Sequence, residues 1–208
     1  MKVAIIATDD QQKEWMTQGH TDNIEVIWLF NIDPLTGADC YIDLLFTNDE
    51  NRIGALSALS SSLIIVNAVL TTGEELPENF IRINGWPGFL KRPIVEASGG
   101  NEKIKTKAEA IFTAFNRTTE WLPAVPGFIA PRVISMIINE AYFTLDEKVS
   151  SKEEIDTAMR LGTNYPYGPF EWSNKIGLKN IHALLVKLSA GDSRYEPSPL
   201  LTKEATQA

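Results

Sequence analysis

The pattern of apolar residues changes once along this chain, at the proline-containing segment 123–126. Before it, short and nearly continuous apolar runs alternate with loops, and after it apolar residues recur at helical spacing. Continuous apolar runs of strand length are typical of parallel strands covered on both faces, whereas a period near 3.6 indicates helices that bury one face. We therefore predict an α/β domain over residues 1–123, followed by an all-α domain over residues 124–208.

The first domain contains seven runs that we predict to be strands of a mainly parallel sheet. A short amphipathic helix is predicted over residues 50–60, and a longer one begins at Asn101, a natural N-cap after two glycines. The first four runs are β-branched or aromatic and nearly all apolar. The seven runs cover residues 3–7, 25–30, 41–46, 63–66, 80–83, 93–97 and 118–122.

Four helices are predicted in the second domain. The first has a broad apolar face from Ile129 to Leu145, which favours burial against several neighbours or a second subunit. The second begins with a capping box at Ser151 and ends at Gly162. The third begins near Pro169, the fourth covers residues 178–189, and the tail after them is predicted to be extended or loose.

Composition narrows the functional classes. The formal net charge of -8 disfavours nucleic acid as a partner. The single cysteine, Cys40, excludes an intramolecular disulfide and lies in an apolar run, which favours a buried thiol over a nucleophile.

No apolar stretch approaches the roughly 20 residues of a membrane span, and residues 1–6 are too short for a signal-peptide core. We expect a cytoplasmic protein without membrane contact. The two histidines lie far apart, so no metal site is predicted.

Several segments after Pro126 resemble one known family. They are Pro-Gly-Phe-Ile at 126–129, Arg132, Lys-Glu-Glu-Ile-Asp-Thr-Ala-Met-Arg-Leu-Gly at 152–162 and Tyr-Pro-Tyr-Gly-Pro-Phe-Glu at 165–171. Together they resemble the C-terminal helical domain of 3-hydroxyacyl-CoA dehydrogenases. The resemblance implies a Rossmann-like first domain, NAD-dependent oxidation of 3-hydroxyacyl-CoA and a homodimer formed through the C-terminal helices. The resemblance covers residues 126–201. In the residues before them it depends only on the order of the strands and on a few positions that match the family's.

The first domain departs from the family where NAD would bind. The family has a G-x-G-x-x-G turn after its first strand, which lets the backbone approach a pyrophosphate. Here that strand leads into Ala-Thr-Asp-Asp-Gln-Gln, with no glycine before Gly19. Asp9 and Asp10 would repel a pyrophosphate, and either is predicted to cap a short helix. A family segment that contacts coenzyme A is reduced to residues 34–37. We therefore expect a shortened Rossmann-like domain that does not bind NAD.

The resemblance also places the family's catalytic positions. The family's orienting glutamate corresponds to Glu96. Asn84 stands where the family has its catalytic histidine, Val69 where it has a serine, and Pro131 where it has an asparagine. No histidine lies between His20 and His182. Glu96 has two interpretations. It either pairs with Arg82, Lys91 or Arg92, which we favour, or acts as a base in another reaction.

These departures favour a degenerate 3-hydroxyacyl-CoA dehydrogenase-like protein that acts in binding or regulation and uses no cofactor. Acyl-CoA or another small molecule is a possible ligand. The alternative is an active oxidoreductase of 3-hydroxyacyl-CoA metabolism with altered catalytic residues, which would use NAD. A third hypothesis is a scaffold or partner subunit.

Overall fold

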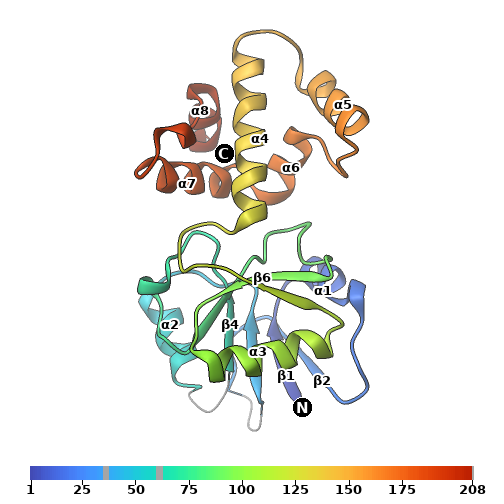
Figure 1. The fold of residues 1–208 in the computed structure, drawn as a ribbon, viewed down its shortest axis with the longest axis vertical. Coiled ribbons are helices and arrows are strands. Elements are labelled where there is room, and N and C mark those ends of the chain that lie inside the picture. The colour runs from blue at the N-terminus through green and yellow to red at the C-terminus, as the bar shows by residue number, and fades with distance from the viewer. Residues whose placement is uncertain (35–37, 60–62, 208) are drawn as a thin grey trace. The chain divides into compact units, whose positions relative to one another are not determined.

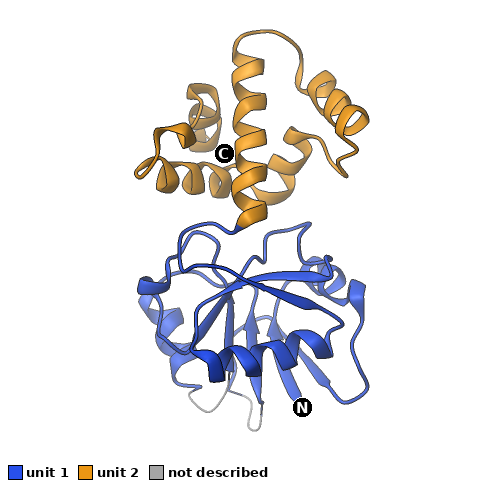
Figure 2. Cartoon of the chain, viewed as in Figure 1, with its two compact units in different colours: residues 1–128 blue, residues 129–208 orange. Residues whose placement is uncertain are grey.

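A computed structural model describes residues 1–34, 38–59 and 63–207. Part of the predicted connection 34–37 and Ser60, the end of a predicted helix, lie outside the described residues. The chain divides into two compact units, Met1–Phe128 and Ile129–Ala208, as Figure 2 shows.

The division between the units comes five residues later than the predicted one, because the segment after Pro123 is attached to the first unit. The backbone N–H of Gly127 donates to the carbonyl of Val69 at 2.8 Å. The Arg82 guanidinium donates to the carbonyl of Val125 at 3.1 Å. These bonds hold residues 125–127 against the first unit.

The first unit contains one seven-stranded sheet, in the order β2-β1-β3-β4-β5-β6-β7. All pairs are parallel except β5 with β6, so the predicted mainly parallel sheet is confirmed. Only about ten residues join β5 to β6, and a parallel connection needs a longer crossover. The strands are β1 Lys2–Ile6, β2 Glu25–Leu29, β3 Cys40–Asp43, β4 Leu63–Asn67, β5 Phe80–Ile83, β6 Ile94–Ser98 and β7 Thr118–Trp121.

Helices cover both faces of this sheet (Figure 1). On one face, α1 (Asp9–Trp15) and α3 (Glu102–Ala114) pack over the β1 residues Val3 and Ile5. On the other, α2 (Glu50–Ser57) packs over Ala4 and its neighbours. Alternate strand residues thus enter two separate cores, which explains why the strands are apolar throughout. Short 3₁₀ helices cover Met16–Gln18 and Gly73–Glu75.

The N-terminus of α1 differs from the prediction. The N-cap is Thr8, not Asp9 or Asp10, and its hydroxyl accepts a hydrogen bond from the backbone N–H of Gln11. The Gln11 side chain in turn accepts from the N–H of Thr8, which completes a capping box. Both aspartates lie in the first turn, where their charges complement the helix dipole. The predicted cap of α3, Asn101, is confirmed.

The second unit is helical, as predicted. Its longest helix, α4 (Ile129–Asp146), buries Ile138 and Tyr142 but leaves Ile129 and Val133 each 53% exposed. The other helices are α5 Lys152–Thr163, α6 Pro169–Ile176, α7 Leu178–Ser189 and α8 Pro199–Gln207, with a 3₁₀ turn at Ser193–Tyr195. Among the described residues, no helix is long and apolar enough to cross a membrane.

The Tyr-Pro-Tyr-Gly-Pro-Phe-Glu segment forms the entry to α6. Asp156 of α5 accepts hydrogen bonds from the backbone N–H groups of Phe170 and Glu171, at 2.8 and 3.2 Å. Gly168 lies so close to Asp156 that a Cβ there would stand 2.5 Å from its Cα. The glycine is therefore needed for space, and the aspartate caps a helix that lies elsewhere in the sequence.

Two predictions for the helical unit are wrong. Helix α5 ends at Thr163 rather than at Gly162, because Asn164 takes the left-handed conformation that ends the helix. The tail is not extended, since residues 199–207 form α8 with Leu201 and Ala205 buried. The Ser198 hydroxyl accepts from the N–H of Leu201 and thereby caps this last helix.

Candidate functional site

Three amide side chains lie where ligands bind in open α/β sheets, at the carboxyl ends of the parallel strands. Gln11 follows β1, Asn67 ends β4, and Asn84 follows β5. We call Gln11, Asn67 and Asn84 the amide network. Each of the three uses both its N–H₂ group and its carbonyl oxygen in hydrogen bonds within the first unit.

Gln11 crosses the point where the strand order reverses. Strands β1 and β3 are neighbours there, and dinucleotides bind in the crevice between such strands. The Gln11 Nε2 atom donates to the carbonyl of Leu44, just after β3, at 3.0 Å. Its Oε1 atom accepts from the N–H of Thr8 at 2.9 Å. The Gln11 side chain therefore bridges this crevice.

Asn67 donates to the same Leu44 carbonyl as Gln11. Its Nδ2 atom donates to Leu44 at 3.3 Å, and its Oδ1 atom accepts from the N–H of Gly85 at 3.0 Å. A Cβ at Gly85 would lie 2.6 Å from Cγ of Asn67, so a glycine is required for this approach. The segments after β3 and β5 are thus joined through one half-buried amide at the end of β4.

Asn84 bonds to Glu96 in the neighbouring strand β6. The Asn84 Nδ2 atom donates to Oε2 of Glu96 at 2.8 Å, and both residues are 7% exposed. The Asn84 Oδ1 atom accepts from the N–H of Trp86 at 3.3 Å. An amide does not accept a proton near neutral pH, so this pair is not a base of the histidine–glutamate type.

The comparisons with known proteins bear first on the helical part of the chain. The family described as "3-hydroxyacyl-CoA dehydrogenase, C-terminal domain" matches residues 127–207. Those residues belong to this family. The predicted resemblance is therefore confirmed over the segment whose motifs suggested it.

Relatives extend the similarity to 3-hydroxyacyl-CoA dehydrogenases beyond that domain. The 3-hydroxybutyryl-CoA dehydrogenase of Bradyrhizobium diazoefficiens is 45% identical over 154 residues, 72% of this chain and 52% of that protein. The 3-hydroxyadipyl-CoA dehydrogenase of Escherichia coli K12 is 48% identical over 114 residues, 54% of this chain and 24% of that protein. A match of 154 residues must include part of the first unit. The chain spans about half the length of such relatives, or less.

Solved structures of 3-hydroxyacyl-CoA dehydrogenases share the fold over both units. The (S)-3-hydroxybutyryl-CoA dehydrogenase of Ralstonia eutropha has a TM-score of 0.75 and 19% identity, and the match covers 99% of this chain and 93% of that one. At this identity the likeness shows the fold alone. It supports the Rossmann-like assignment of the first unit, which the sequence matched only faintly.

The structure shows where the predicted positions lie. It brings Asn84 and Glu96 together, whereas the expected ion pair of Glu96 with Arg82, Lys91 or Arg92 stays a prediction. Val69 is 3% exposed and contributes only its backbone carbonyl, which accepts from Gly127. Pro131 is buried in the first turn of α4. Neither the valine nor the proline side chain can hydrogen-bond a substrate oxygen.

Cys40 is not a candidate nucleophile. The residue is fully buried in β3, and this burial raises the pKa of its thiol, so the thiolate is disfavoured. The predicted buried thiol is confirmed. Among the described residues, no three His, Cys, Asp or Glu side chains are grouped so that they could hold a metal ion.

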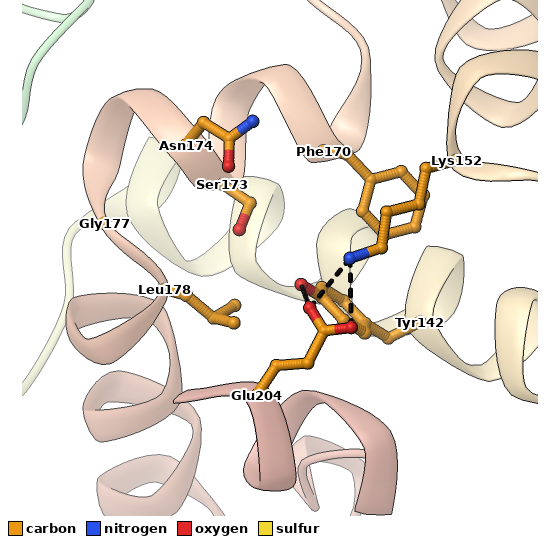
Figure 3. Close-up of a pocket in the computed structure, with 8 residues that line it drawn as sticks. All are labelled: Tyr142, Lys152, Phe170, Ser173, Asn174, Gly177, Leu178 and Glu204. Atoms are coloured by element: carbon orange, nitrogen blue, oxygen red, sulfur yellow. Dashed lines mark hydrogen bonds and ion pairs between the residues drawn. The ribbon is translucent and has the colours of Figure 1, made fainter. Parts of the chain in front are cut away.

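The helical unit has a cavity of about 350 Å³, shown in Figure 3. At its centre, Nζ of Lys152 donates to both carboxylate oxygens of Glu204, at 3.0 and 2.8 Å. The Tyr142 hydroxyl donates to the same carboxylate at 2.8 Å. The remaining lining residues are Phe170, Ser173, Asn174, Gly177 and Leu178.

Two pKa values reflect this arrangement. Burial raises the pKa of Tyr142, and the hydrogen bond to Glu204 raises it further, so the phenol stays protonated. Burial alone would raise the pKa of Glu204, but the hydrogen bonds from Lys152 and Tyr142 outweigh it and hold this pKa below its ordinary value. Sequence reasoning missed the cavity because Glu204 lies in α8, where no helix was predicted.

Proposed function

We propose that this protein is a 3-hydroxyacyl-CoA dehydrogenase homologue that acts in the cytoplasm by binding or regulation, without NAD-dependent hydride transfer. The amide network carries the proposal. Where a dehydrogenase needs a proton acceptor, Asn84 offers a neutral amide whose two ends are already bonded to Glu96 and Trp86. The polar groups at this edge of the sheet serve the fold.

The segment after β1 does not suit a dinucleotide. A pyrophosphate needs free N–H groups and a backbone without side chains at this turn. Here the Thr8–Gln11 capping box uses N–H groups at the start of α1, and the Gln11 side chain extends to Leu44. Asp9 and Asp10 add negative charge in the first turn. These residues do not fit a dinucleotide in the family's position, so we assign no reaction step to NAD.

A second candidate function is an active oxidoreductase of 3-hydroxyacyl-CoA metabolism. The comparisons favour it, because the relatives are named as dehydrogenases of 3-hydroxyacyl-CoA compounds and the similarity reaches into the first unit. Glu96 would then be the candidate base. Such an enzyme would have to bind NAD despite the closed turn after β1.

Turnover distinguishes the two candidates. Purified protein is mixed with 3-hydroxybutyryl-CoA and NAD⁺, and reduced nicotinamide is followed by absorbance. We expect no rate above that of a mock purification. A rate that Glu96→Gln abolishes would establish the oxidoreductase and overturn the binding role.

A thermal-shift measurement tests for a ligand. A shift with 3-hydroxybutyryl-CoA but not with pantothenate would support acyl-CoA as the ligand, and no shift with either compound would favour a scaffold.

We also propose a homodimer formed through the helical unit. Ile129 and Val133 lie one helical turn apart on α4 and are each 53% exposed. Exposed apolar side chains in one row favour a protein contact. Val133→Asp should shift the mass measured by light scattering from dimer to monomer, whereas Val149→Asp, outside α4 and 68% exposed, should not. A monomeric wild-type protein would refute the dimer.

A further inference from the structure

The groups around Nζ of Lys152 resemble a binding site for an organic cation. This Nζ atom lies 5.4 Å from the ring centroid of Tyr142 and 5.3 Å from that of Phe170. The two rings meet edge to face, with centroids 5.1 Å apart, and form two walls around the ammonium group. The Glu204 carboxylate provides a third contact (Figure 3). Aromatic faces attract an ammonium group, and a carboxylate adds an ion pair. We call this arrangement the ammonium cage.

The charges of the cage select the sign of a ligand. Apart from Lys152, the lining has one charged group, the Glu204 carboxylate, and the ring faces also carry negative potential. Ser173 and Asn174 are neutral. An anion that attracted Lys152 away from Glu204 would still face this carboxylate, whereas a cation that replaced Lys152 would gain all three contacts. The cage therefore favours a cation.

The cavity is larger than one ammonium group. Its volume of about 350 Å³ extends along Leu178, Ser173 and Asn174, so a ligand can place an alkyl chain beside apolar and neutral polar groups. The rim is accessible, because the Lys152 side chain is 38% exposed and that of Glu204 is 34% exposed. Lys152 can therefore turn toward solvent without burying its charge.

We propose that the ammonium cage binds a small organic cation of the alkylammonium class, which displaces Nζ of Lys152. The Lys152 ammonium group then competes with the ligand for the cage, and because it belongs to the same chain it always remains close to the site. A short tether corresponds to an effective concentration of about millimolar or higher, so the wild-type protein should bind such a cation only weakly. Removal of the lysine side chain should strengthen binding, while removal of the carboxylate charge should weaken it.

Titration calorimetry with n-butylammonium chloride, at matched ionic strength, tests the proposal. We expect saturable binding to the wild type with a Kd in about the millimolar range, at least about tenfold tighter binding to Lys152→Ala and at least about tenfold weaker binding to Glu204→Gln. Sodium butyrate and n-butanol should not bind. Absence of saturable binding to the wild type, or equal binding of butanol, would overturn the proposal.

Two controls keep the test interpretable. Lys105 has a similar but incomplete environment, with Glu102 at 3.0 Å and the Trp121 ring at 5.5 Å, so Lys105→Ala should not change butylammonium binding. Glu204→Gln retains an oxygen that can accept from the Tyr142 hydroxyl. If Lys152→Ala does not fold, the comparison of wild type with Glu204→Gln still decides, because equal affinities would refute a cation site.

Discussion

Asn84 and Glu96 face each other across the antiparallel pair of β5 and β6, and they are joined twice. The Asn84 side chain donates to the Glu96 carboxylate at 2.8 Å, and its backbone N–H donates to the Glu96 carbonyl at 3.1 Å. The Glu96 residue thus accepts hydrogen bonds from both the side chain and the backbone of Asn84. The Asn84 amide in this pair does not accept a proton near neutral pH.

Asn84→Ala should lower the free energy of unfolding by about 1–3 kcal/mol, because it leaves a buried carboxylate oxygen of Glu96 without this partner. Urea denaturation measures the change. Asn48→Ala is the matched control, since Asn48 also donates to a glutamate, Glu75, at 3.0 Å but lies at the surface. Its cost should stay within about 0.5 kcal/mol. Equal costs would contradict a buried structural role for Asn84.

Gln11→Ala should cost about 1 kcal/mol of stability, because the side-chain half of the capping box of α1 and the bridge to Leu44 are both lost. The neighbouring Gln12 makes only a long bond of 3.4 Å to the carbonyl of Ala7, so Gln12→Ala should cost less. Thermal unfolding of the two variants side by side measures the difference. A larger loss for Gln12→Ala would refute the role given to Gln11.

Gly168→Ala should destabilise the helical unit by at least about 2 kcal/mol, because the added methyl group would overlap Asp156, including its backbone. Gly162→Ala is the control. Apart from its chain neighbours and the backbone of its own helix, no described atom lies within 4 Å of the Cβ that Gly162 would gain, and alanine is the better helix former, so this change should stabilise by about 0.5 kcal/mol. If both variants unfold at the same denaturant concentration, the close packing of Gly168 is wrong.

Stability should fall in acid through Glu204. The pKa of this glutamate is held below its ordinary 4.5 in the folded protein. A depressed folded-state pKa gives stability that is present above pH 4.5 and lost as pH falls through the lower, folded value. The stability difference between wild type and Glu204→Gln should therefore shrink below pH 4.5. A difference that stays constant into acid would show that the Glu204 charge contributes nothing.

The fold was largely predictable because its signals are local. All seven strands and the cap at Asn101 follow from apolar runs and cap chemistry within a few residues. The tail was misjudged because the cap of α8 depends on Ser198, held by a hydrogen bond to Asn139, which is 59 residues away in the sequence. The cap that Asp156 of α5 forms on α6 was not predicted either, because it also joins residues that are distant in the sequence.

The candidate site was predictable only in part. The resemblance located Asn84 and Glu96, and the Thr-Asp-Asp-Gln string already had the spacing of a capping box. Nothing in the sequence indicated that Gln11 and Asn67 would both donate to one carbonyl, at Leu44, because that depends on strand order. The ammonium cage combines residues from α4, α5, α6 and α8, and such tertiary contacts leave no periodic signal.

Calorimetric titration with NADH tests the central claim most directly, because it examines the turn after β1 without requiring turnover. The Gln11 side chain is hydrogen-bonded from the segment after β1 to that after β3. We therefore expect no saturable heat with NADH at concentrations up to about 1 mM, equivalent to a binding free energy weaker than about -4 kcal/mol. A Kd in the micromolar range, about -8 kcal/mol, would contradict the account and support the dehydrogenase.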